Sequence, residues 1–292
     1  MLSGKKGFYY WILVIACFVL FSFVPRTSYR LPFSSPSCNE ILRNTITSVE
    51  NIKTLKFHLK CNERFKGKLL STQSQVKLNA VPRKVYIYLK GPELLWLEGK
   101  NNGNALVNPD GFPFMNVNLD PMGSLMRDNQ HHTIHEVGFN YFASIIKNSI
   151  QVVGEEFDGH FKCDGTIKWD GDDCYFVIAE YPDFKYVEYT VQKGETLETI
   201  ARKFKVSDYM ILELNADKVH NYRDVKANQK IKIPNVYGRK MILYIDVETF
   251  LPRVIKVYDE KGLFESYEYH DLELNPVIAD EEFTREYKEY GF

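Results

Sequence analysis

The 292-residue sequence predicts an α+β fold, in which an antiparallel β-sheet packs with helices. Between residues 54 and 108, and again from 241 to 274, short apolar-rich runs alternate with turn residues, which is typical of antiparallel strands. Residues 39–51 and 138–150 instead space their apolar side chains like helices. Residues 188–234 interrupt the strands with a strand–helix–helix–strand order of their own.

Composition limits the class of protein. Apolar residues make up 45% of the chain and aromatic residues 14%, which is enough for a sizeable core and excludes a disordered or collagen-like chain. The 37 basic and 38 acidic side chains leave a net charge of −1. Because nucleic-acid-binding proteins usually carry a basic excess, we expect no nucleic-acid partner.

The N-terminus carries a membrane-directed signal. Residues 8–24 form an unbroken run of 17 residues without a charge, and Lys5 and Lys6 precede it. This run is long enough, at the short limit, to cross a hydrocarbon core, and the lysines fit a cytoplasmic N-terminus. We therefore predict an N-terminal transmembrane helix that uses residues 1–25 as a membrane anchor.

Two other interpretations of this segment stay open. Val14-Ile15-Ala16-Cys17 resembles a lipobox, in which Cys17 would be the lipidated residue of a lipoprotein. A cleaved signal peptide is the third interpretation. All three place the chain after a Pro- and Ser-containing linker, residues 26–37, outside the cytoplasm.

Residues 188–234 contain the most informative local pattern. A turn at Lys193-Gly194-Glu195 follows a short strand, and Thr196 can cap a helix with apolar residues at i, i+3, i+4 and i+7. Ser207 can cap a second helix, and a polar loop then leads to a strand at residues 230–233. The order is strand, helix, helix, strand.

This segment resembles a LysM module over essentially its whole length. The motifs that match the family are Tyr189-Thr190-Val191, Lys193-Gly194-Glu195-Thr196-Leu197, Ile200-Ala201, Leu214-Asn215 and Gln229-Lys230-Ile231-Lys232-Ile233-Pro234. The resemblance implies binding of N-acetylglucosamine-containing glycans, such as peptidoglycan, in a shallow groove between two loops. The glycan-binding residues that it implies are Gly194, Glu195, Thr196, Leu197, Asn215, Ala216 and Asp217.

In this interpretation, backbone groups at the helix start bond the acetamido group and Leu197 contacts its methyl. Glu195 stands where Asp is more usual in the family, and Ala227-Asn228 replaces a common Pro-Gly. The alternative is a LysM fold that serves as a spacer without glycan affinity.

The strands after residue 237 are too few to bury a core by themselves. We therefore expect residues 38–187 and 237–292 to form one discontinuous sheet-plus-helix domain. The LysM domain, residues 188–234, is then an insertion at a hairpin tip, where insertions are tolerated.

The outer parts of the chain resemble an uncharacterised family of bacterial envelope proteins. The motifs are Lys84-Val85-Tyr86, the stretch from Leu94 to Gly103, His131 to Gly138, and Leu251-Pro252 through Gly262 to Tyr269. The helix-then-strands order is also similar to the lipoprotein-carrier fold, a curved antiparallel half-barrel closed by helices, whose concave face holds acyl chains. This resemblance implies that the predicted sheet is a curved half-barrel. This second resemblance implies a lipid or an envelope protein as the partner of the sheet domain.

Four cysteines lie beyond the N-terminal run. Turn residues between Cys163 and Cys174 favour a hairpin that could place the two sulfurs opposite each other, so we predict a Cys163–Cys174 disulfide. Cys38 and Cys61 form a second, less favoured pair. Neither pair has a CxxC spacing, which argues against a redox or zinc site.

His131, His132, His135 and Glu136 form the densest group of metal-ligand residue types. They could hold a metal, or they could cap and pack a loop that leads to the helix at Gly138. Because the spacing does not match HExxH, we predict no metal and no other cofactor. The sequence also shows no nucleophile elbow or phosphate loop, so we expect no enzymatic activity.

These observations predict a non-enzymatic protein of the bacterial cell envelope, anchored in the inner membrane with its bulk in the periplasm. Its LysM domain would bind peptidoglycan and position a sheet domain that binds a lipid or a protein partner. A lipid or lipoprotein carrier that uses the concave face of the sheet is one alternative. A cell-wall-targeted hydrolase is the other.

Overall fold

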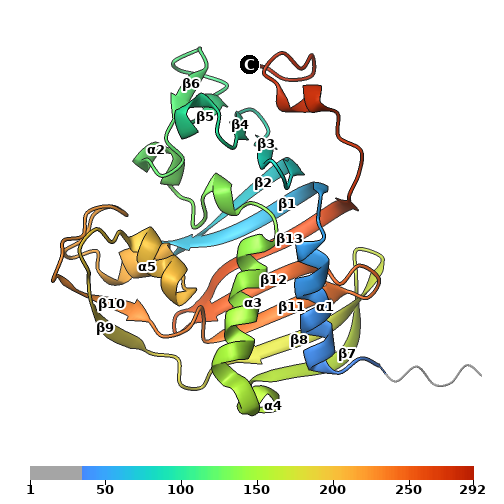
Figure 1. The fold of residues 1–292 in the computed structure, drawn as a ribbon, viewed down its shortest axis with the longest axis vertical. Coiled ribbons are helices and arrows are strands. Elements are labelled where there is room, and N and C mark those ends of the chain that lie inside the picture. Colours follow the sequence, from blue (N-terminus) through green and yellow to red (C-terminus); the bar gives the residue numbers. More distant parts are fainter. Residues whose placement is uncertain (1–34) are drawn as a thin grey trace, which may run out of the picture. The chain divides into compact units, whose positions relative to one another are not determined.

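Eleven antiparallel strands form one curved sheet in the computed structural model, which describes residues 35–292 (Figure 1). The order of strands across the sheet is β6-β5-β4-β3-β2-β1-β13-β12-β11-β8-β7. In chain order these strands are β1 (Thr54–Phe65), β2 (Lys68–Asn79), β3 (Lys84–Tyr88), β4 (Glu93–Leu97), β5 (Ala105–Asn108), β6 (Val117–Leu119), β7 (Phe161–Trp169), β8 (Asp172–Glu180), β11 (Lys240–Asp246), β12 (Pro252–Asp259) and β13 (Gly262–Leu274). The predicted α+β class, with a curved antiparallel sheet and packed helices, is confirmed.

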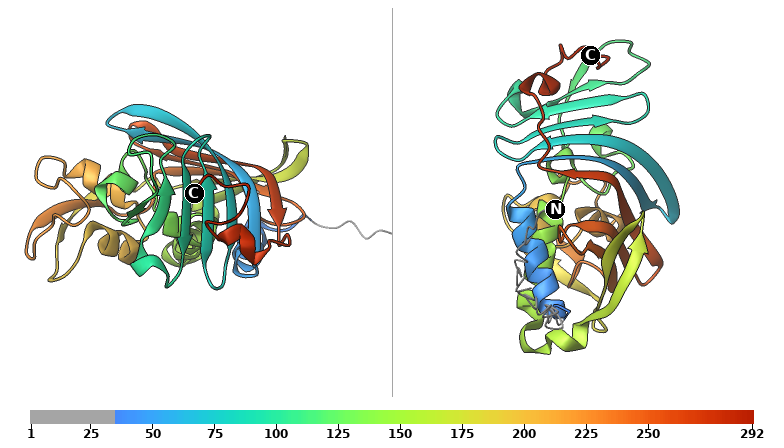
Figure 2. Two further views of the ribbon diagram at one scale, coloured as in Figure 1. Left: turned by 90° about the horizontal axis from the view of Figure 1, so that it is seen from above. Right: turned by 90° about the vertical axis from the view of Figure 1, so that its right-hand side faces the viewer.

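Two helices, α1 (Cys38–Glu50) and α3 (Asn140–Val153), pack against each other and against one face of the sheet (Figures 1 and 2). Ser37 begins α1 because its hydroxyl accepts from the backbone N–H of Glu40, whose carboxylate accepts in return from the Ser37 backbone N–H. One side of each helix is buried in the main core. The shorter helical segments are α2 (Ser124–Arg127), α4 (Phe157–His160) and the 3₁₀ turns η1 (Asn101–Gly103), η2 (Ile134–Glu136), η3 (Gly154–Glu156) and η4 (Asp280–Phe283).

Tight two-residue turns join the strands of the two long hairpins. Lys66 and Gly67 connect β1 to β2, and Asp170 and Gly171 connect β7 to β8. All four residues have positive φ, the conformation that two-residue hairpin loops need in order to match the twist of the strands.

The sheet is assembled from two parts of the chain that are far apart in sequence. Strands β8 and β11 are hydrogen-bonded neighbours, although residues 181–239 separate them. On the other side, β1 pairs with β13 along most of its length. The three strands that follow residue 239 therefore fill the middle of the sheet, and neither part of the chain could complete it alone.

Residues between β8 and β11 contain a second, two-stranded sheet. Its elements are β9 (Tyr186–Thr190), α5 (Leu197–Phe204), α6 (Asp208–Leu214) and β10 (Lys230–Pro234), in the order that the sequence predicts. We call this the βααβ segment. Thr196 and Ser207 accept capping hydrogen bonds at the starts of the two helices. A separate core inside this segment includes Val191, Leu197, Ile200, Ile211, Val219, Ile231 and Ile233.

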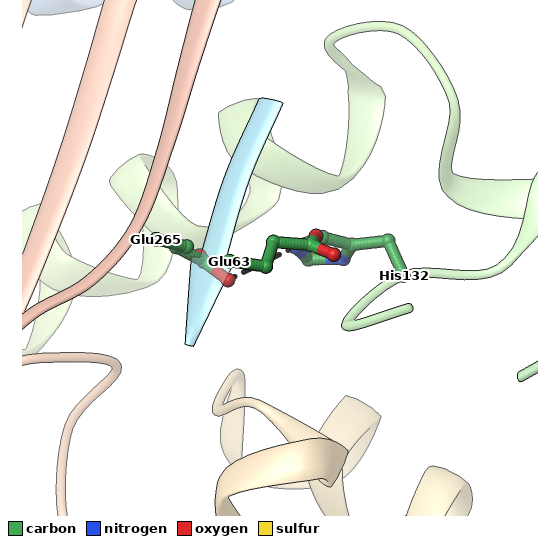
Figure 3. Close-up of side chains that lie close together, drawn as sticks. All are labelled: Glu63, His132 and Glu265. Atoms are coloured by element: carbon green, nitrogen blue, oxygen red, sulfur yellow. Dashed lines mark ion pairs between the residues drawn. The ribbon is translucent and has the colours of Figure 1, made fainter. Parts of the chain in front are cut away.

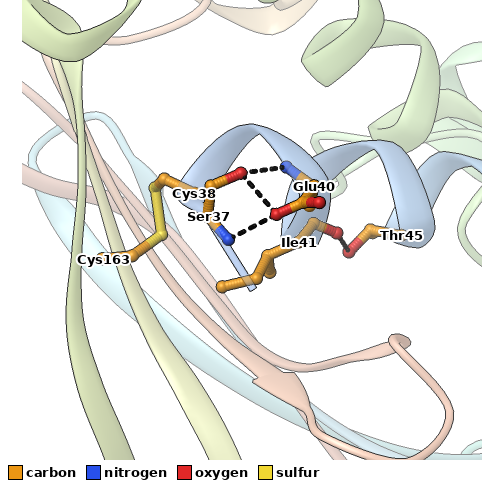
Figure 4. Close-up of a disulfide and its surroundings, with 6 residues drawn as sticks. All are labelled: Ser37, Cys38, Glu40, Ile41, Thr45 and Cys163. Carbon is orange, nitrogen blue, oxygen red and sulfur yellow. Dashed lines mark hydrogen bonds between the residues drawn. A yellow bond between two sulfur atoms is a disulfide. The ribbon is translucent and has the colours of Figure 1, made fainter. Parts of the chain in front are cut away.

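The disulfide joins Cys38 to Cys163, so the predicted Cys163–Cys174 pairing is wrong (Figure 4). The hairpin of β7 and β8 forms as expected, but its register places Ile167 opposite Cys174 and Cys163 opposite Val177. Cys163 instead meets the first residue of α1, at a Cα–Cα distance of 5.4 Å. Cys61 and Cys174 are buried free thiols, which also contradicts a Cys38–Cys61 pair.

The predicted membrane anchor and the lipidation candidate Cys17 lie outside the described residues. Among residues 35–292, no helix is both long enough and apolar enough to cross a membrane.

The C-terminal segment covers part of the sheet face that points away from α1 and α3. Phe283 is buried with Tyr86 and Leu95, and the ring of Tyr290 stacks on Tyr86 with centroids 3.8 Å apart. Glu282 accepts from Lys77 at 2.7 Å. This tail therefore closes a satellite core behind β3 and β4.

The Cys38–Cys163 disulfide predicts which peptides stay linked after digestion and predicts that its removal lowers stability. Digestion without reduction should give linked peptides that contain Cys38 and Cys163. Because the bridge closes a loop with a sequence separation of 125, C38S/C163S should lower the free energy of unfolding by about 3 kcal/mol, measured by urea unfolding. A linked peptide pair that contains Cys163 and Cys174 would contradict the assignment.

Candidate functional site

A cavity of about 400 Å³ lies between the concave side of the sheet and the segment that carries α2 and α3. This volume is within the range of small-molecule sites. The cavity opens to solvent, because Leu125 lines it while 76% of that residue is exposed. Its apolar lining includes Leu59, Val76, Ile87, Leu94, Val107, Leu119, Met126, Ile134, Phe142, Ile145, Met241 and Ile255.

Four carboxylates, those of Glu63, Asp128, Glu136 and Glu265, line this largely apolar cavity, and two of them face each other across neighbouring strands. Glu63 on β1 and Glu265 on β13 are direct cross-strand neighbours, and only 4% and 1% of them is exposed. Figure 3 shows both side chains beside His132. Like charges at facing positions of a sheet are destabilising, and burial increases that cost. The surrounding polar groups must therefore compensate for both charges.

His131 supplies much of that compensation. Its backbone N–H donates to Glu63 at 3.1 Å, its Nδ1 lies 2.8 Å from Glu265, and its Nε2 lies 3.1 Å from the carbonyl oxygen of Arg64. Both ring nitrogens of His131 therefore lie within hydrogen-bond distance of an acceptor oxygen. The ring stacks on both Phe264 and Tyr209, with centroids 4.3 and 4.4 Å away.

His132 faces the cavity from the other side of the two carboxylates. Its Nδ1 lies 3.2 Å from Glu136, and its Nε2 lies 3.5 Å from Glu265. Burial acts to lower the pKa of His132, but the charges of Glu265 and Glu136 outweigh it and hold that pKa well above its ordinary value. Burial likewise acts to raise the pKa of Glu265 and Glu136, yet His132 holds both below their ordinary values.

Two tyrosines complete the arrangement. Tyr237 donates to Glu265 at 2.7 Å, and Tyr267 donates to Glu63 at 2.6 Å and to Glu265 at 3.2 Å. Burial and the charge of Glu265 raise the pKa of both phenols well above the ordinary value, so they stay neutral donors. We call this group the buried polar cluster; it consists of Glu63, His131, His132, Glu136, Tyr237, Glu265 and Tyr267.

Among residues 35–292, Glu63, His132 and Glu265 are also the group best placed to hold a metal, since one ligand atom from each lies within 4.8 Å of the others. Their hydrogen bonds argue for a cluster that is complete with protons alone. Each carboxylate already accepts from a tyrosine and from His131, and Glu265 faces the raised-pKa ring of His132. A cation at this place would have to displace the proton on His132.

The βααβ segment docks next to the buried polar cluster. The guanidinium of Arg127 donates to Asp208 of α6 at 2.9 and 3.0 Å, donates to the His131 carbonyl at 3.1 Å, and lies 3.8 Å from the centre of the Tyr222 ring. This ion pair is buried, with 4% of Arg127 exposed and 7% of Asp208. Tyr209 and Met210 of α6 belong to the main core. The start of α6 therefore fixes the segment to the sheet domain.

The residues predicted to bind glycan divide into two groups. Gly194, Ala216 and Asp217 are exposed, and Glu195 and Thr196 are half-buried. Leu197 and Asn215 are fully buried. Each of the seven lies outside the start of α6 through which the segment docks, so the docking leaves the exposed members accessible.

The predicted contact between Leu197 and an acetamido methyl is wrong, because the capped start of α5 directs this side chain into the core of the segment. Asn215 holds its loop instead: its amide bonds the carbonyls of Ile211 and Lys232, and its oxygen accepts from the Lys232 N–H. Glu195 similarly accepts from Tyr189 and from the Gln192 N–H.

Sequence reasoning found one half of the buried polar cluster and missed the other. His131, His132 and Glu136 were recognised as a group, and the loop interpretation holds for His135, whose ring packs on Trp96. Glu63 and Glu265 were missed, because 68 and 134 residues separate them from His131. A usable signal existed: Glu265 shares its strand parity with Tyr267 and Tyr269, which also line the cavity.

Comparison with known families assigns two regions of the chain. The model of the LysM domain matches residues 189–234, and the model described as "Protein of unknown function (DUF1571)" matches residues 52–193. The chain therefore carries a LysM domain, in agreement with the sequence motifs, and the match to the family of unknown function covers just under half of the chain. No curated protein matches the chain.

Several solved structures are similar to this chain at low sequence identity. Lipoprotein LppX of Mycobacterium tuberculosis is 14% identical, with 85% of this chain and 100% of that chain covered and a TM-score of 0.39. A LolA superfamily protein of Nitrosomonas europaea is 10% identical, with 87% and 100% covered and a TM-score of 0.31. The Pseudomonas aeruginosa MucA/MucB complex gives 10% identity, 85% and 60% covered and a TM-score of 0.35, so this chain spans 60% of the matched chain.

The raised pKa of His132 predicts how stability depends on pH. A histidine whose pKa is higher in the folded state stabilises the protein fully below its unfolded pKa of about 6.5, and this contribution is lost as the pH rises through the folded pKa. H132Q should therefore lower the free energy of unfolding by about 3 kcal/mol at pH 6. The deficit relative to the wild type should shrink towards pH 10, measured by urea unfolding.

H220Q, which changes an exposed histidine in the LysM domain, is the control for loss of a histidine. A deficit for H132Q that grows with pH would contradict the charged state of His132.

Proposed function

We infer that this chain, which carries a LysM domain in contact with an antiparallel sheet domain, is a non-enzymatic cell-envelope protein that binds peptidoglycan and an amphiphilic ligand. The LysM domain binds the glycan, and the cavity of the sheet domain holds the ligand. The observation that carries the second half is an open, apolar cavity with the buried polar cluster in its wall.

Binding of peptidoglycan is supported by the match to the LysM domain and by the exposure of three of the residues predicted to bind glycan. Gly194, Ala216 and Asp217 lie at the surface. Asp208 and Tyr209, which contact Arg127 and the main core, lie in a different part of the LysM domain. A wall glycan can therefore reach the predicted loops while the sheet domain stays attached.

Binding of an amphiphile is supported by the two kinds of surface in the cavity. The apolar walls favour a hydrocarbon chain, because each buried methylene contributes about 0.8 kcal/mol. The buried polar cluster has three carboxylates, Glu63, Glu136 and Glu265, against two imidazole rings. The cluster therefore favours a head group that is cationic or donates hydrogen bonds.

In this proposal the protein is held in the periplasm between membrane and wall, with residues 8–24 as its inner-membrane anchor. The lipoprotein interpretation, with Cys17 lipidated, gives the same compartment. Release of soluble fragments from purified cell wall by the protein would contradict its non-enzymatic character.

Filling the cavity should abolish ligand binding. Ile87 lines the cavity and is half-buried, so I87W should weaken binding of the fluorescent apolar amine N-phenyl-1-naphthylamine at least 10-fold, measured by fluorescence titration. Single-chain amphiphiles of equal length should displace the probe better with an ammonium head group than with a carboxylate.

V277W is the matched control, since Val277 is 94% exposed and does not line the cavity. Equal probe affinity of I87W and V277W would contradict the cavity as the ligand site. Better displacement by the carboxylate amphiphile would contradict the role given to the polar cluster.

Blocking the glycan loop should abolish wall binding. Ala216 is exposed in the predicted loop, so A216W should reduce co-sedimentation with purified peptidoglycan at least 10-fold. A227W places the same side chain at an exposed position outside the predicted residues of the same domain and should bind like the wild type. If both variants sediment equally with peptidoglycan, the glycan site is not at these loops.

A further inference from the structure

Three large apolar side chains are strongly exposed in the loop between β5 and β6. Phe112 is 87% exposed, Phe114 85% and Met115 64%. The two phenylalanine rings pack edge to face on each other, with centroids 6.3 Å apart. Single exposed apolar residues are normal on a protein surface, but three within four positions mark an interaction site. We call Phe112, Phe114 and Met115 the apolar tip.

The apolar tip belongs to a loop that begins and ends at the cavity. Pro109 and Leu119, which lie on either side of the loop in sequence, both line the cavity. Leu125, which follows shortly after, lines it too and is 76% exposed. The strands that hold the loop, β5 and β6, form the end of the sheet opposite β7 (Figure 1). Exposed apolar surface and the opening of the cavity therefore lie on the same part of the molecule.

We propose that the apolar tip inserts into the surface of a phospholipid bilayer and holds the opening of the cavity against it, so that the ligand passes between bilayer and cavity. This inference rests on the proposed function, because it names the bilayer as the source of the amphiphile in the cavity. Aromatic rings and methionine are suited to the boundary between head groups and acyl chains.

The charges around the loop specify the kind of bilayer contact. Residues 111–117 contain no charged side chain, so insertion of the tip buries no charge. Asp110 and Asp120 flank the loop, and neither would attract an anionic surface. The attraction is therefore apolar, which predicts contact with zwitterionic phosphatidylcholine vesicles and little dependence on salt.

The contact can be tested with a fluorophore that reports polarity. M115C in a C17S background of the full chain would be labelled with a nitrobenzoxadiazole dye; Cys61 and Cys174 are buried and Cys38 and Cys163 are paired. In the presence of phosphatidylcholine vesicles, the dye at position 115 should shift to shorter wavelength and be quenched by lipids with nitroxide-labelled chains. V277C, labelled in the same way at a 94% exposed position, should keep an aqueous spectrum.

An aqueous spectrum at position 115 with vesicles present would overturn the proposal, and so would the same shift in the absence of lipid, which would indicate a second copy of the chain as the occupant of the tip. The anchor segment is present in both labelled proteins, so vesicle binding through it does not decide the result.

A second variant separates the tip from the cavity. F112S/F114S removes both rings without changing a cavity residue, so probe affinity in solution should stay unchanged while uptake of the probe from vesicles slows at least 10-fold. V277S should behave like the wild type in both measurements. Uptake at the wild-type rate would overturn the role of the tip, whereas failure of the proposed function would appear as loss of probe binding in every protein, the wild type included.

Discussion

The ring of His131 is the point on which the arrangement of this protein depends. The backbone N–H of His131 bonds Glu63, its two ring nitrogens contact Glu265 and the Arg64 carbonyl, and the ring stacks on Phe264 and Tyr209. Strand β1, strand β13 and helix α6 therefore meet at one side chain. Without His131, the two buried carboxylates that face each other across β1 and β13 would each lose a hydrogen-bond partner.

The same place joins the LysM domain to the sheet domain. Arg127 bonds the His131 carbonyl and the carboxylate of Asp208 with one guanidinium. Tyr209, the next residue of α6, covers the His131 ring. The polar contacts fix the orientation of the LysM domain, and Tyr209 and Met210 bury apolar surface in the main core. The docking is therefore both specific and buried. In the proposed function, a LysM domain held in this way orients the sheet domain relative to the wall glycan.

A cluster of buried charges lowers the stability of a protein, and a hydrophobic core can form without such a cluster. In this molecule the charged cluster lies where the sheet and α3 enclose a cavity. The combination of apolar walls, a polar group of carboxylates and imidazoles, and an exposed apolar tip beside the opening suits an amphiphile better than a soluble polar substrate. The three proposed activities, which are wall binding, ligand binding and bilayer contact, would use three separate surfaces of one chain.

Local features of this protein followed from the sequence by itself. The two long helices, the hairpin turns at Asp170-Gly171 and at Glu260-Lys261, and the LysM elements depend on the spacing of apolar residues and on turn and cap chemistry within a few positions. The tertiary structure alone decided which distant residues meet.

A β7–β8 hairpin was predictable, but its register placed Cys163 opposite Val177 and left Cys163 free to form the disulfide with Cys38. The histidine pair was visible in the sequence, whereas its partners Glu63 and Glu265, the cavity beside them and the docking of Asp208 on Arg127 were not. These contacts depend on how an eleven-stranded sheet brings together strands from both ends of the chain, and no local pattern encodes that pairing.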